Sequence, residues 1–86
     1  MNDTTLKAAI TRYGNDRQIL QAVEECAELQ QALLHYRRGK VPHASVVDEI
    51  ADVMIMAGQM RLIFGERLVD EAVTYKVDRL EKRLAA

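Results

Sequence analysis

The chain has 86 residues, of which 49% are hydrophobic and 29% are charged, and its net charge is −1. This composition is typical of one globular, helix-rich domain and excludes a disordered chain. A nearly neutral chain has no global basic field, which argues against a nucleic-acid partner or an anionic membrane surface. A lone chain of this size buries little surface, so we expect it to oligomerise.

Glycine and proline divide the chain into four predicted helices, one short and three long. Counting their caps, the predicted ranges are 4–13, 15–38, 45–64 and 66–84. No stretch alternates with period two for long enough to indicate a strand. The sequence therefore predicts an all-α fold in a single domain, residues 1–86.

Helix N-caps are predicted from the residues whose side chains accept a hydrogen bond from the first turn. The candidates are Asp3 or Thr4, Asn15 or Asp16, and Ser45. With Ser45 as the cap, Asp48 and Glu49 fall in the first turn of the third helix, where the helix dipole favours acidic groups.

The second and third helices are joined by a short loop that contains the only proline, so they should pack antiparallel. The third helix is apolar on nearly every side, which is typical of a central helix. Its acidic residues make a membrane span improbable. Cys26 lies on the apolar arc of the second helix, and we interpret it as a packed thiol.

Targeting and redox signals are sparse. The N-terminus has neither the basic nor the apolar region of a signal peptide. Cys26 is the only cysteine, so no intrachain disulfide can form. Both features favour a cytoplasmic location.

Two acidic pairs carry the functional signal: Glu25 with Glu28, and Glu49 with Asp52. Residues three apart share one face of a helix. The second pair lies in an otherwise apolar stretch, where a charged carboxylate is costly unless something compensates it. The alternative is that these acids are solvated or paired with the 12 Lys and Arg residues.

A divalent metal ion would compensate such a cluster. Carboxylate oxygens alone suit Mg²⁺, with Mn²⁺ as a possible substitute, and such sites keep positions open for phosphate oxygens. A di-iron site is disfavoured because it requires Glu-x-x-His pairs, and no His lies three residues after these acids.

The pattern Glu24-Glu25-x-x-Glu28 followed by Glu49-x-x-Asp52 resembles the EExxE…ExxD signature of the MazG-like nucleotide pyrophosphohydrolases. The resemblance covers residues 18–83. It implies a helical bundle completed by oligomerisation, as a homodimer or a dimer-of-dimers tetramer. It also implies Mg²⁺-dependent hydrolysis of a (deoxy)nucleoside triphosphate to the monophosphate and pyrophosphate.

The resemblance also implies roles for individual residues. The expected metal ligands are Glu25, Glu28, Glu49 and Asp52. Glu24 or Glu28 would act as the catalytic base. Lys76 and Arg79, one turn apart on the fourth helix, would bind the phosphates, as point charge and fork respectively. Gln18 and Gln21 precede the first acidic pair by one or two turns and are candidates for the nucleoside pocket.

Two alternatives remain open from the sequence. One is a phosphoribosyl-ATP pyrophosphohydrolase, which shares the architecture. The other is a non-catalytic helical module for oligomerisation or regulation, whose acidic residues are structural. Metal binding separates the second alternative from the enzymes, because a bound ion stabilises the fold and a structural module is indifferent to it.

Overall fold

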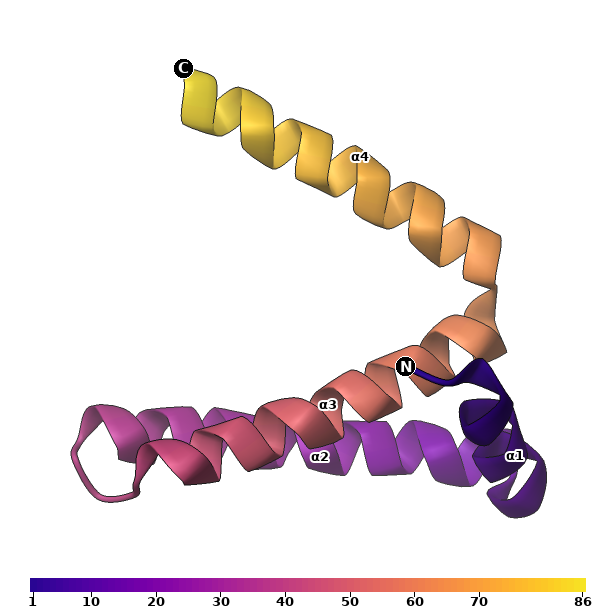
Figure 1. The fold of residues 1–86 in the computed structure, drawn as a ribbon, viewed down its shortest axis with the longest axis horizontal. Coiled ribbons are helices and arrows are strands. Elements are labelled where there is room, and N and C mark those ends of the chain that lie inside the picture. Colours follow the sequence, from indigo (N-terminus) through magenta and orange to yellow (C-terminus); the bar gives the residue numbers. More distant parts are fainter.

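The computed structural model spans residues 1–86 and consists of helices and short connections, without strands (Figure 1). The helices are α1 (Asp3–Tyr13), α2 (Asn15–Arg37), α3 (His43–Phe64) and α4 (Glu66–Ala85). The all-α class and the division into one short and three long helices are confirmed. None of these helices combines the length and apolarity needed to cross a membrane.

The N-caps of α1 and α2 differ from the predicted ones by one or two residues. The Asn2 side chain caps α1, because its Oδ1 accepts a hydrogen bond of 2.9 Å from the Thr4 N–H. Gly14 ends α1 and begins α2 with φ 89°, a backbone conformation that favours glycine. Neither Asn15 nor Asp16 therefore serves as the cap of α2.

The start of α3 was predicted wrongly. Pro42 is the N-cap, with extended backbone, and its carbonyl accepts a 3.0 Å hydrogen bond from the Ser45 N–H. Proline suits this position because a cap residue does not need its own N–H for the helix. Ser45 therefore lies inside the first turn, and Asp48 and Glu49 lie beyond it, since the first turn contains no acidic residue.

Helices α2 and α3 form an antiparallel hairpin, as predicted, and α3 is the one helix that contacts all the others (Figure 1). Its buried Gln59 accepts a 2.6 Å hydrogen bond from the buried Gln18 of α2. Leu6 of α1 packs against Gly58 so closely that a Cβ there would lie 2.8 Å from the leucine Cδ1. Glycine thus permits the close approach of α1 to α3.

Helix α4 diverges from the hairpin, so that α3 and α4 form the two arms of a V (Figure 1). Gly65, with φ 120°, makes the turn between them. Arg61 donates from Nε and from one terminal nitrogen to the two carboxylate oxygens of Asp70, each at 2.7 Å. No residue of α4 is buried, so the four helices do not close into a bundle within one chain.

Candidate functional site

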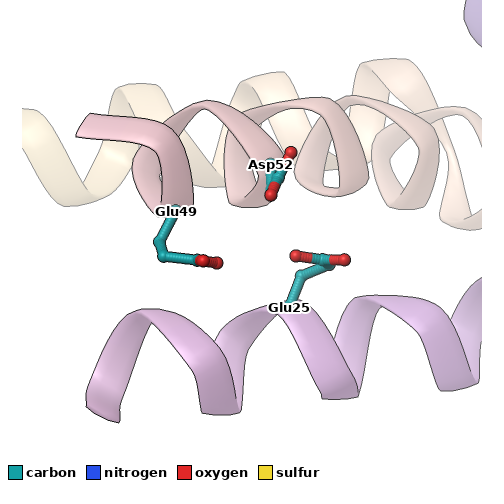
Figure 2. A group of neighbouring side chains, drawn as sticks. All are labelled: Glu25, Glu49 and Asp52. Atoms are coloured by element: carbon teal, nitrogen blue, oxygen red, sulfur yellow. The ribbon is translucent and has the colours of Figure 1, made fainter. Parts of the chain in front are cut away.

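Three carboxylates converge between the helices of the hairpin. Glu25 extends from α2, and Glu49 and Asp52 belong to α3, on the other side of the gap (Figure 2). One carboxylate oxygen of each residue lies within 4.8 Å of the others. The predicted meeting of the two acidic pairs thus occurs for three of their four residues.

Two oxygens of this acidic group are buried and lack any hydrogen-bond partner: Glu25 Oε2 and Glu49 Oε2. A buried acceptor without a partner is costly, and a charged one more so. The ion pairs of the chain use Asp3, Asp70, Glu71 and Asp78. No Lys or Arg therefore neutralises the acidic group, which argues against the salt-bridged alternative.

The surroundings of the acidic group raise the pKa of Glu25. Burial is the largest cause and raises this pKa above its ordinary value of 4.5, and the neighbouring charges of Glu28 and Asp52 raise it further. A hydrogen bond of 2.9 Å from Gln21 Nε2 to Glu25 Oε1 acts in the opposite direction. The fold thus holds Glu25 in a place that disfavours its charge.

The donor set fits a hard divalent cation. It offers carboxylate oxygens alone, which Mg²⁺ and Mn²⁺ prefer, and a cation would give the two buried oxygens the partner that the chain lacks. Glu25 and Glu49 are partly buried, whereas Asp52 is exposed. The group is therefore open to solvent on one side, where water or phosphate oxygens have access.

The other predicted acidic residues lie at the margin of this group. Glu28 is exposed and outside the three-residue cluster, yet its negative charge contributes to the raised pKa of Glu25. Glu24 is also exposed. Adjacent residues of a helix do not share a face, so Glu24 and Glu25 point in different directions.

The two predicted phosphate-binding residues are not brought to the acidic group within one chain. Lys76 and Arg79 lie on α4, which has no contact with α2 and diverges from the hairpin (Figure 1). Neither side chain takes part in an ion pair. The guanidinium of Arg79 lies 5.9 Å from the centre of the Tyr75 ring.

The two predicted nucleoside-binding glutamines have different environments. Gln18 is buried and its Nε2 donates a hydrogen bond to Gln59, a partner that was not predicted from the sequence. The sequence signal for this partner is Gln59 itself, the single amide side chain in the apolar helix α3. Gln21 bonds to Glu25 and lines a polar hollow of about 230 Å³ with Tyr13 and Arg17.

A comparison with known proteins finds no family model, no curated protein and no solved structure that matches the chain.

Proposed function

We propose that this protein is a Mg²⁺-dependent nucleoside triphosphate pyrophosphohydrolase, which converts a (deoxy)nucleoside triphosphate to the monophosphate and pyrophosphate. The observation that carries the proposal is the pair of buried, partnerless oxygens of Glu25 and Glu49 on facing helices. These residues belong to the pattern that resembles the MazG-like signature, and Asp52 of that pattern lies beside them.

Glu25, Glu49 and Asp52 would hold the metal, with Glu28 at the edge of the group. A bound divalent cation would supply positive charge against the phosphates and lower the pKa of a coordinated water. Asp52, the exposed ligand, leaves the substrate side open. Mn²⁺ has similar ligand preferences and would substitute for Mg²⁺.

Proton transfer falls to a carboxylate near the metal ligands. Of the two predicted bases, Glu28 is favoured over Glu24, because Glu28 interacts with Glu25. Glu28 would accept the proton of the attacking water. Gln21 would orient Glu25 through its hydrogen bond, so that the remaining Glu25 oxygen faces the metal position.

The proposal includes assembly into a homodimer or a pair of dimers. Lys76 and Arg79 lie on a helix that has no contact with α2 of its own chain. In the proposed enzyme they would bind the phosphates from another chain's α4, where Arg79 would act as a fork and Lys76 as a point charge.

The first test is pyrophosphate release from a panel of ribo- and deoxyribonucleoside triphosphates, with and without Mg²⁺. Wild type is compared with Glu49→Gln, and Asp48→Asn serves as the control because Asp48 is an exposed acid on the same helix. We expect Mg²⁺-dependent release that Glu49→Gln abolishes and Asp48→Asn retains. Full activity of Glu49→Gln would refute the proposed site.

The melting temperature in Mg²⁺ or Mn²⁺ separates the remaining outcomes. A bound ion raises it in proportion to occupancy. No activity and no thermal shift would favour the non-catalytic helical module. No activity with a clear shift would keep the metal site and direct the search to other substrates, beginning with phosphoribosyl-ATP.

A further inference from the structure

One buried hydrogen bond between side chains joins α2 to α3. Gln18 Nε2 donates to Gln59 Oε1 at 2.6 Å, and the two residues are 6% and 3% exposed. The other buried side chains of α3 are apolar, namely Val46 and Met56. The contact between the two helices thus places two amides away from water, and we call Gln18 and Gln59 the amide pair.

Stability alone does not account for the amide pair. Both side chains give up hydrogen bonds to water, and the other contact of Gln59 Nε2 is the thioether sulfur of Met56 at 3.7 Å, a weak acceptor. A buried hydrogen bond between neutral groups contributes little net stability, and apolar groups of the same shape can replace both partners at little cost. What the amides supply is direction, because a donor must meet an acceptor in one geometry, whereas apolar contacts are non-directional.

Helix spacing links the amide pair to the acidic group. Gln18 lies seven residues before Glu25 on α2, and Gln59 lies seven residues after Asp52 on α3. Seven residues are about two turns, so each glutamine lies on nearly the same face of its helix as the acidic residue. Because the two helices are antiparallel, the contact of Gln18 with Gln59 brings Glu25 opposite Asp52.

The acidic group tolerates little displacement of one helix along the other. One carboxylate oxygen of each of Glu25, Glu49 and Asp52 lies within 4.8 Å of the others. A shift of one residue moves α3 by about 1.5 Å and turns its side chains by about 100°, and a shift of one turn moves α3 by about 5.4 Å. Mg²⁺ holds its oxygen ligands at about 2.1 Å, so either shift would remove a ligand.

The amide pair is the directional contact that the two helices share. It forms the only side-chain hydrogen bond between α2 and α3, and no ion pair joins them. At the other end of the hairpin, the Gly39 N–H donates to the Tyr36 carbonyl at 2.9 Å and orders the turn. Glu25 lies between this turn and Gln18, and it is closer in sequence to Gln18.

We propose that Gln18 and Gln59 are positioning residues, which set the register of α2 against α3 and so hold Glu25 opposite Glu49 and Asp52 for a divalent cation. The cation is that of the proposed function, on which this inference rests. Gln18 then acts through the acidic group rather than by contact with the nucleoside. A pair that sets the register controls metal affinity more than the stability of the metal-free fold, so measuring both quantities separates this role from a structural one.

The test replaces both amides by methionine, which has a similar length and shape but no amide. The variant with Gln18→Met and Gln59→Met should melt in EDTA at the wild-type temperature or above, yet bind Mn²⁺ about tenfold or more weakly, as measured by electron paramagnetic resonance. Gln31→Met is the control, because Gln31 is exposed on the same helix, and it should bind Mn²⁺ as wild type does. Unchanged Mn²⁺ affinity in the double variant would overturn the proposal. So would a joint loss of affinity and melting temperature, which indicates a structural role.

The register is also measured without metal, from the distance between spin labels at Leu20→Cys and Asp48→Cys in a Cys26→Ala chain diluted with unlabelled protein. Both labelled positions are exposed, on α2 and α3 respectively. The native amides should give one narrow distance, whereas the methionine pair should broaden or shift the distribution by up to about 5 Å, one turn of helix. Identical distributions would overturn the proposal. Absence of Mn²⁺ binding in wild type would instead contradict the proposed function, and the distances alone would then decide whether the amides set the register.

Discussion

At the scale of single residues, the acidic group works against the stability of the metal-free fold. Burial raises the pKa of Glu25 above 4.5, so the folded chain binds this proton more tightly than the unfolded chain does. A carboxyl of this kind lowers stability as the pH rises toward neutrality, because folding must then accommodate the charge. A bound metal ion would offset this destabilisation. Substitution of Glu25 therefore tests the metal site without any substrate.

Glu25→Gln should raise the melting temperature of the metal-free protein at pH 7, because the amide removes the buried charge and keeps the shape. The same change should abolish the increase that Mg²⁺ produces in wild type, since a ligand is lost. Scanning calorimetry in EDTA and in Mg²⁺ measures both effects, with Asp48→Asn as the control. A lower melting temperature of Glu25→Gln in EDTA would contradict this account of the cluster.

The advantage of Glu25→Gln over wild type should shrink as the pH falls. In wild type, the destabilisation by Glu25 is present above its folded pKa and disappears as the pH falls through that value toward 4.5. Melting temperatures of both proteins in EDTA from pH 7 to pH 4.5 test this. A difference that is constant over the whole range would show that ionisation of Glu25 is not its origin.

The residues of the site were predictable from the sequence only where helix spacing determines position. The convergence of Glu25, Glu49 and Asp52 follows from two acidic pairs in the middles of two antiparallel helices. The position of Lys76 and Arg79 relative to the acidic group could not be predicted in this way, because residue spacing along α4 does not determine the direction in which α4 leaves α3. In Figure 1, α4 points away from the α2–α3 hairpin, so its residues Lys76 and Arg79 lie apart from the acidic group.

At the scale of elements, helix ends were predicted better than helix starts. Gly14 and Gly65 end helices where predicted, since both adopt positive φ. The N-caps of α1, α2 and α3 were misplaced because several neighbouring residues could each act as the cap, whereas the start of α4 at Glu66 was predicted correctly. At α3, the extended backbone of Pro42 places the cap three residues before Ser45. Which residue becomes the N-cap depends on the path of the preceding loop, and local residue preferences do not determine that path.

The docking of α1 depends on Leu6, which is 5% exposed and packs on Gly58 of α3. Leu6→Ala should reduce the free energy of unfolding by about 2–5 kcal/mol, the range for a buried leucine truncated to alanine. Urea denaturation measures the change. Leu20→Ala is the matched control, because Leu20 is 66% exposed and its truncation should change stability by less than about 0.5 kcal/mol. Equal effects of the two substitutions would contradict the close docking of α1.

At the scale of the whole molecule, the chain has the helices of a bundle but not its closed interior. The buried apolar side chains are only Leu6, Val46 and Met56, and none of them is completely enclosed. Chain length alone predicted that a partner is needed. It could not indicate that α4 would diverge from the hairpin, since that direction depends on the turn at Gly65 and on the Arg61–Asp70 fork.

The melting temperature should therefore rise with protein concentration, because association removes folded chains from the unfolding equilibrium. The dependence should disappear in Leu80→Glu, which puts a charge on the apolar side of α4, and persist in Thr74→Glu, which puts it on an exposed polar position. Calorimetry over a hundredfold range of concentration measures it. A wild-type melting temperature that is independent of concentration would contradict the proposed assembly.

The separation of α4 from the hairpin also has a consequence for the order of folding. The hairpin can form within one chain, since its helices are adjacent in sequence and contact each other along their length. Helix α4 buries no residue within the chain, so it lacks the tertiary packing from which helices in proteins draw most of their stability. Refolding should thus show a fast first-order phase for the hairpin, followed by a second-order phase in which α4 becomes ordered. A newly synthesised chain would expose the Lys and Arg residues of α4 to proteases until it meets another, so the abundance of the protein would set its own rate of turnover.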